Sequence, residues 1–208
     1  INLEQMITGT RIIDANGRKG ALANGKNTSY EDFAEEYLSE ASEKPFNAYY
    51  ERPFMKKLLP SSLSGKTVLD LGCATGFYSL HCAENGAAVV AVDSSAKMVE
   101  GTLKITEKHN VTGVVHDIGQ PFDFLAGGSV DIVIASLVMH YIDDWSLPLG
   151  EIYRVLKPGG KCIASTHHPI MDYQLFNQKD YFQKRLVEDQ WRGFTKPLKV
   201  RYFVRPLN

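Results

Sequence analysis

The segment of the sequence that most clearly suggests chemistry is residues 68–76, where an apolar run leads into a turn containing Gly72 and Gly76. Glycine has no Cβ, so a ligand can approach the backbone of such a turn closely. The run predicts a buried strand, and the residues after the turn predict a helix whose first N–H groups suit a carboxylate or a phosphate. In an open parallel sheet, ligands bind at the carboxyl ends of the strands. The segment therefore indicates a ligand site.

Acidic residues follow the next two predicted strands. Asp93 ends the run 89–93, and its carboxylate could accept two hydrogen bonds from ribose hydroxyls or, alternatively, cap the next helix. Asp117 follows the run 113–116 and could accept a hydrogen bond from an adenine amino group while Ile118 covers the ring; as an alternative it caps a loop. A glycine turn followed by a strand-end acid, in this order, favours a nucleoside ligand.

The elements that must position these residues alternate along the chain. Short β-rich runs predict five strands, and amphipathic stretches between them predict helices, which is typical of parallel βαβ units. Residues 156–160, Leu-Lys-Pro-Gly-Gly, should end the last helix and turn the chain into the fifth strand. The predicted strands are 67–71, 89–93, 113–116, 130–135 and 161–166, and the predicted helices are 76–85, 96–108 and 147–155.

The two ends of the chain differ from this middle part. Residues 1–28 contain four glycines and predict a loosely ordered arm. Residues 29–59 carry an apolar face at helical spacing, with Ser29 as a candidate N-cap. Residues 169–208 are rich in aromatic and basic side chains and are expected to form a lid, a surface extension or a contact in a homo-oligomer. We therefore expect an arm (1–28), a ligand-binding domain (29–168) and an extension (169–208).

The composition restricts the class of protein. A chain of 208 residues with 44% hydrophobic and 23% charged residues can bury a sizeable core. Its net charge of −1 argues against a protein that mainly binds a nucleic-acid backbone. The sequence contains no apolar run long enough to cross a membrane and no signal segment at its start, so we expect a cytoplasmic protein. Three cysteines without a C-x-x-C pair predict neither a disulfide framework nor a metal site.

Together these motifs resemble the class I S-adenosylmethionine-dependent methyltransferases, most closely the branch that methylates small molecules and quinone-like substrates. The resemblance covers about residues 29–168 and rests on 68–76, on Asp93, on His116-Asp117, and on the blocks 131–137 and 156–160. It implies an α/β, Rossmann-like, doubly wound and mainly parallel sheet with strand order 3-2-1-4-5 and helices on both faces. The family's two further strands are missing from the pattern of residues 169–208, where only 200–204 reads as a strand.

The resemblance also implies roles for individual residues. The glycine turn would hold the methionine part of the cofactor, the second strand's acid the ribose, and the third strand's pair the adenine. Ser136 would lie beside the transferable methyl group. Aromatic contacts from the N-terminal helix make Tyr30, Tyr37 and Tyr49 candidates, although each could equally be a core residue. The implied cofactor-binding residues are Asp70, Gly72, Cys73, Gly76, Asp93, Ser94, Met98, Asp117, Ile118 and Ser136.

The implied reaction is an in-line displacement that moves a methyl group to a small-molecule acceptor and leaves S-adenosylhomocysteine. Alignment of the reactants can supply about 7–11 kcal/mol, and a general base is needed only if the acceptor must lose a proton. Candidates for that base are His140 and Tyr141, after the fourth strand, and His167 and His168, after the fifth. Each histidine could instead be a packing or loop residue.

Two other functions are compatible with the same crevice. One is a nonenzymatic, cofactor-binding regulatory protein that has lost the transfer chemistry. The other is a nicotinamide-dependent oxidoreductase, but that class needs G-x-G-x-x-G, whereas this turn reads G-x-x-x-G. The segment after the fourth predicted strand, Ser-Leu-Val-Met, also lacks the Asp/Asn-Pro-Pro-aromatic run expected of an enzyme that methylates nucleic-acid bases.

Overall fold

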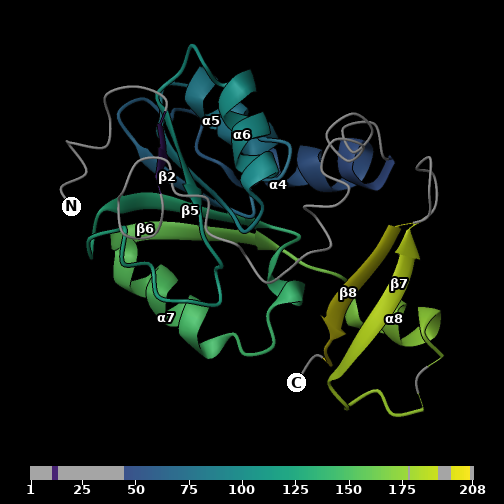
Figure 1. Ribbon diagram of the computed structural model, residues 1–208. Coiled ribbons are helices and arrows are strands. Elements are labelled where there is room, and N and C mark those ends of the chain that lie inside the picture. The colour runs from purple at the N-terminus through teal and green to yellow at the C-terminus, as the bar shows by residue number, and fades with distance from the viewer. Residues whose placement is uncertain (1–10, 14–44, 178, 192–197, 207–208) are drawn as a thin grey trace.

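The computed structural model describes residues 11–13, 45–177, 179–191 and 198–206 (Figure 1). Its main sheet has six strands in the order β1-β4-β3-β2-β5-β6, and all pairings are parallel. The five predicted strands are present in the predicted order 3-2-1-4-5, so the fold prediction is confirmed. The strands are β1 (Arg11–Ile13), β2 (Thr67–Leu71), β3 (Ala88–Asp93), β4 (Val111–Val115), β5 (Val130–Ser136) and β6 (Leu156–Ser165).

Helices cover both faces of this sheet. Helices α5 (Phe77–Glu84) and α6 (Ala96–Ile105) pack on one face, and α7 (Ser146–Val155) packs on the other (Figure 1). All five residues of β2 are buried, because successive side chains point to opposite faces and each face has its own core. Val68 belongs to the core under α5 and α6, and Leu69 to the core under α7. Because both faces of β2 are buried, its sequence is mainly apolar and does not alternate between apolar and polar residues.

The N-terminal part of the chain differs from its prediction at one point. Residues 11–13 form β1, which pairs with β4, rather than part of a loosely ordered arm. The edge of β4 presents unpaired backbone groups, and β1 satisfies them. The predicted helix over 29–59 is described from residue 45 onward. There the chain is a π-helical turn η2 (Phe46–Glu51) followed by α4 (Arg52–Leu58). Ser29, Tyr30 and Tyr37 lie outside the described residues.

The segment 156–160 is not the turn that the sequence predicts. Strand β6 already begins at Leu156, which pairs with Val130, and the register then shifts before Ile132 pairs with Lys161. Gly159 has a φ of +77°, which only glycine adopts freely, and it lies in the extra residues of this bulge. The proline and glycines therefore produce an irregularity inside the strand, and the helix ends at Val155 as predicted.

The C-terminal extension forms a separate small unit. It contains α8 (Pro169–Leu175) and an antiparallel pair, β7 (Arg185–Trp191) and β8 (Leu198–Val204). The pair lies beyond the carboxyl end of β6 and is not part of the main sheet (Figure 1). Tyr202 of β8 is 1% exposed and packs in a small core near the 3-10 turn η3 (Met139–Tyr141). Within the residues that the structure describes, no helix is long and apolar enough to cross a membrane.

Candidate functional site

The turn between β2 and α5 has the conformation that its glycines predict. Gly72 and Gly76 have φ values of +72° and +75°, and the N–H groups of Gly72 and Cys73 donate to the Val92 carbonyl of β3 at 2.8 and 2.9 Å. A Cβ on Gly72 would lie 2.5 Å from the Val138 side chain. Gly72 is therefore required both for its backbone conformation and for the space it leaves free.

Asp93 at the end of β3 holds this turn in place. Its Oδ2 accepts a hydrogen bond from the Ala74 N–H at 3.0 Å, and its Oδ1 accepts one from the Ser95 N–H at 2.9 Å. Ala74 has a φ of +45°, which is unfavourable for a residue with a Cβ, and the bond to Asp93 helps to offset that cost. Asp93 therefore fixes the turn and the residue before α6, whereas the N-cap of α6 itself is Ser95.

Residues close to Asp93 in sequence differ in their exposure. Ser94 is half-buried, whereas the Met98 side chain is fully buried within α6. The Met98 N–H donates to Oγ of Ser95, the N-cap residue of α6. Cys73 is 5% exposed, and burial, with smaller contributions from Asp93 and Asp70, raises the pKa of its thiol well above the ordinary value. Cys73 is therefore a neutral residue of the turn rather than a nucleophile.

Asp70 is a buried acid inside β2. Its side chain is 1% exposed, and the Ser79 hydroxyl donates to its Oδ2 at 2.6 Å. Burial, together with the nearby charges of Asp93 and Glu51, raises the pKa of Asp70 from 3.8 to about 6, against the lowering effect of the Ser79 bond. Asp70 is therefore within electrostatic reach of two further carboxylates, those of Asp93 and Glu51.

Glu51 is the residue of this site that sequence reasoning missed. Its Oε1 accepts hydrogen bonds from the hydroxyls of Ser136 and Ser165, and its Oε2 accepts one from the Tyr78 hydroxyl, each at 2.7 Å. Ser136 and Ser165 are the last residues of β5 and β6. The carboxylate therefore lies over the carboxyl edge of the sheet. No local sequence motif predicts this role of Glu51, because its hydrogen-bond partners are far away in the sequence.

The third strand's acidic pair is arranged as a loop cap. Asp117 is exposed, and its Oδ1 accepts a hydrogen bond from the Gly119 N–H at 2.9 Å. Ile118 is 5% exposed and packs in the core beneath α7. The alternative that the sequence left open for Asp117 is thus present in the structure, and Asp117 remains accessible to a ligand at the same time.

The candidate bases after β5 and β6 form an aromatic cluster. The rings of His140 and His167 stack at 4.0 Å, and Tyr202 packs edge-on against both. His140 is 2% exposed, and neither of its ring nitrogens has a hydrogen-bond partner among the described residues. Burial, and then the charge of His167, lower its pKa well below 6.5, so His140 is neutral at pH 7. A ring this deeply buried does not reach a ligand without movement of the hairpin.

The other candidates in this region are more accessible. His167 is partly exposed, and its Nδ1 lies 3.5 Å from Oδ1 of the buried Asp172, although the pair lacks hydrogen-bond geometry. His168 is exposed at the N-cap position of α8, and Tyr141 is half-buried beside β8. Tyr49 is 81% exposed and is therefore not a core residue of the described part. The His167 ring thus lies next to the Asp172 carboxylate, whereas His168 meets Asp172 through its backbone carbonyl, which accepts from the Asp172 N–H at 3.1 Å.

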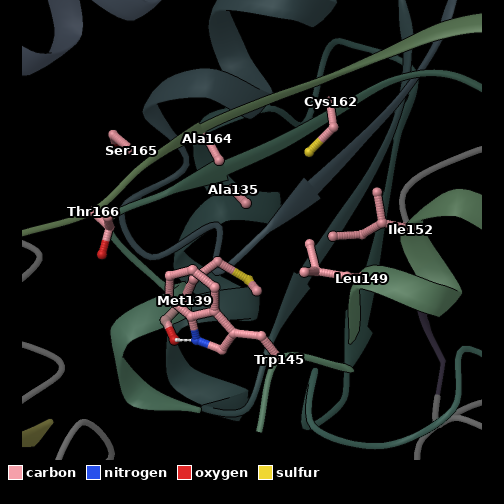
Figure 2. Close-up of a pocket in the computed structure, with 9 residues that line it drawn as sticks. All are labelled: Ala135, Met139, Trp145, Leu149, Ile152, Cys162, Ala164, Ser165 and Thr166. Atoms are coloured by element: carbon pink, nitrogen blue, oxygen red, sulfur yellow. Dashed lines mark hydrogen bonds between the residues drawn. The ribbon is translucent and has the colours of Figure 1, made fainter. Parts of the chain in front are cut away.

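A small apolar cavity lies between α7 and strands β5 and β6 (Figure 2). Its volume of about 110 Å³ is well below the roughly 300–1,000 Å³ of typical ligand pockets, so it is not the site of a nucleoside. Trp145 covers one end and donates from its ring nitrogen to the Met139 carbonyl at 2.7 Å. The cavity is lined by Ala135, Met139, Trp145, Leu149, Ile152, Cys162, Ala164, Ser165 and Thr166.

The residues present suit a ligand that carries positive charge. In the described ranges, no ion pair joins Asp70 or Glu51 to a basic side chain. The two carboxylates also repel each other, which contributes to the raised pKa of Asp70. Carboxylates without a basic partner beside a site favour a cation there. S-adenosylmethionine carries a sulfonium and an ammonium group, so the chemistry of these side chains fits it.

Comparison with known proteins identifies the family. Residues 62–197 match the family model described as a methyltransferase domain. A demethylmenaquinone methyltransferase of Lactococcus lactis is 31% identical over 153 residues, which are 70% of this chain and 58% of that protein. A malonyl-[acyl-carrier protein] O-methyltransferase of Serratia marcescens is 33% identical over 107 residues, 51% of this chain and 40% of that protein. The chain spans about half the length of the curated relatives it matches.

A solved structure supports the same assignment. A Listeria monocytogenes protein described as an S-adenosylmethionine-dependent methyltransferase matches with a TM-score of 0.65 and 26% identity, covering 76% of this chain and 74% of that chain. The family match covers more than half of the sequence and contains the glycine turn, both strand-end acids and all three helices of the βαβ units. The chain therefore belongs to the S-adenosylmethionine-dependent methyltransferase family.

Proposed function

We propose that this protein transfers a methyl group from S-adenosylmethionine to a small-molecule acceptor. The observation that carries the proposal is the set of carboxylates around the glycine turn, of which Asp70 and Glu51 have no basic partner in the described part of the chain. A nicotinamide cofactor would bring a negatively charged pyrophosphate to this turn, and the same carboxylates would repel it. The charge of the site therefore favours the sulfonium cofactor over the dinucleotide.

The proposed cofactor site follows the carboxyl edge of β2, β3 and β4. Gly72, Cys73 and Gly76 would present backbone to the methionine part, with Asp70 beneath them. The carboxylate of Asp93 and the backbone at Ser94 would hold the ribose. Asp117 and Ile118 would flank the adenine, with Met98 supporting the site from the core and Ser136 beside the reacting end of the ligand. When bound, S-adenosylmethionine supplies an electrophilic methyl group on a positively charged sulfur.

The protein's own contribution is alignment and exclusion of water. The turn is held by bonds from Gly72 and Cys73 to β3 and from Ala74 to Asp93, so its backbone is preorganised before a ligand binds. We propose that the domain 29–168 binds the cofactor and that the extension 169–208 acts as a lid over the acceptor. Tyr202 supports this role because it already packs on His140 and His167 at the ends of β5 and β6.

The proposed acceptor is a small organic molecule. The names of two relatives describe methylation of demethylmenaquinone and of malonyl-[acyl-carrier protein], which indicates acceptors with a small reactive group. The apolar and aromatic side chains near the strand ends suit the carbon skeleton of such a molecule. If the acceptor must lose a proton, His167 beside Asp172 is the more accessible candidate base and the buried His140 the less accessible one.

Isothermal titration calorimetry with S-adenosylmethionine tests the cofactor assignment. Replacing Asp93 by alanine removes both bonds to the turn and the proposed ribose contacts, so we expect binding to weaken by about 1–3 kcal/mol. The matched control is Asp180→Ala, an exposed aspartate of the extension, which should leave affinity unchanged. Unchanged affinity of Asp93→Ala would refute the assignment. Incubation with methyl-labelled cofactor and a metabolite panel then separates an enzyme from a regulator, because a regulator binds without turnover.

A further inference from the structure

Three hydrogen bonds hold the Glu51 carboxylate at the carboxyl edge of the sheet. All three groups that donate to it are neutral hydroxyls, from Ser136, Ser165 and Tyr78. Burial, and then its bond to Glu51, raise the pKa of Tyr78, so this phenol stays protonated and remains a donor. Such donors hold the carboxylate in one orientation but do not cancel its charge. The geometry therefore holds a partly buried carboxylate with hydroxyl donors alone.

The position of this carboxylate relates it to the cofactor site. Tyr78 belongs to α5, the helix that begins directly after the glycine turn, and Ser136 ends β5 beside β2. Glu51 also contributes to the raised pKa of Asp70 inside β2, so the two charges interact. The guanidinium of the neighbouring Arg52 lies over the Phe77 ring at 4.2 Å. In the described residues, no cation lies within ion-pair distance of Glu51.

We propose that Glu51 is a specificity-determining residue that favours the positively charged sulfonium form of the cofactor over the neutral thioether product. The proposal rests on the cofactor assignment made under the proposed function. S-adenosylmethionine and S-adenosylhomocysteine differ by one methyl group and by the positive charge on sulfur. A carboxylate held at this edge attracts the first more than the second, and the attraction falls when the charge is lost. Glu51 would thereby promote exchange of product for substrate.

The test is calorimetric and requires no acceptor. S-adenosylmethionine, S-adenosylhomocysteine and sinefungin, an analogue with an ammonium group near the position of the sulfonium, are titrated into the wild type and Glu51→Gln. The amide keeps a similar shape and can still bond to the hydroxyls, but it carries no charge. We expect affinity for the two charged ligands to fall about tenfold while affinity for S-adenosylhomocysteine changes less than twofold.

Two controls separate charge from packing. Glu100→Gln makes the same substitution at an exposed position of α6 and should leave all three affinities unchanged. Ser165→Ala removes one donor but keeps the carboxylate, so the preference for charged ligands should persist. If Glu51→Gln does not fold, Glu51→Ala provides a second charge-free variant, in which water can reach the three hydroxyls.

The outcomes are distinct. A fall in affinity that is confined to the charged ligands supports the role of Glu51. An equal loss for all three ligands, or no change for any, overturns it, because a group that senses the sulfonium charge must affect the ligands differently. If the wild type binds none of the three, the proposed function itself is overturned. The failure of the inference is thus distinguishable from the failure of the cofactor assignment.

Discussion

Asp70 makes the stability of this protein depend on pH in a way that can be calculated. Burial, together with the charges of Asp93 and Glu51, raises its pKa from 3.8 to about 6 in the folded protein. The folded state therefore holds a proton that the unfolded state has already released at intermediate pH. The stabilisation that this proton contributes is fully present below pH 3.8, the ordinary pKa, and is lost as the pH rises through about 6, the pKa in the folded protein. The complete effect is about 3 kcal/mol, of which about 2 kcal/mol falls between pH 4.5 and 7.5.

The assay is urea unfolding of the wild type and Asp70→Asn at several pH values. Asparagine does not titrate, so the stability of the wild type relative to the variant should fall by about 2 kcal/mol from pH 4.5 to 7.5. Glu151→Gln is a control for which the pH dependence should have the opposite sign. The bond from Arg154 lowers the pKa of Glu151, so this residue stabilises the folded state at neutral pH and loses that effect as the pH falls. Parallel curves for the wild type and Asp70→Asn would refute the reasoning for Asp70.

Two further substitutions test the turn and the extension. Gly72→Ala should lower the free energy of unfolding in urea by about 2–4 kcal/mol, because alanine resists a φ of +72° and its Cβ would clash with Val138. Adding Val138→Ala in the same chain should recover part of the loss. Full stability of the Gly72→Ala single variant would contradict the packing argument. Arg205 stacks on Trp145 and donates hydrogen bonds to the carbonyls of Ile142 and Asp143. Arg205→Ala should therefore raise the rate of amide hydrogen exchange across β7 and β8. The control Arg201→Ala removes an exposed ion pair with Glu188 and should leave this rate unchanged.

Local patterns were sufficient to predict the centre of the fold. The apolar runs of β2, β3 and β5 are buried on both faces, so they are recognisable without tertiary information. The glycines of the turn are explained by their backbone angles and by the clash that a Cβ would cause at Gly72. The position of Asp93 at the end of β3 follows from the strand pattern alone.

Contacts between distant segments account for what could not be predicted. Glu51 meets Ser136 and Ser165 across 85 and 114 positions of sequence, and no local pattern marks such a meeting. The stacking of His140 on His167 likewise depends on two strands ending side by side. The bulge at residues 156–160 was predicted as a turn because proline and glycine are typical of both, and only the pairing of β6 with β5 distinguishes them.

The most direct test of the central claim is a crystal structure of the protein bound to S-adenosylhomocysteine. We expect the nucleoside along the carboxyl edge of β2, β3 and β4, with the ribose against Asp93, the adenine between Asp117 and Ile118, and the thioether toward Glu51 and Ser136. A ligand seated elsewhere, or an edge that stays closed by side chains while the ligand binds in solution, would contradict it.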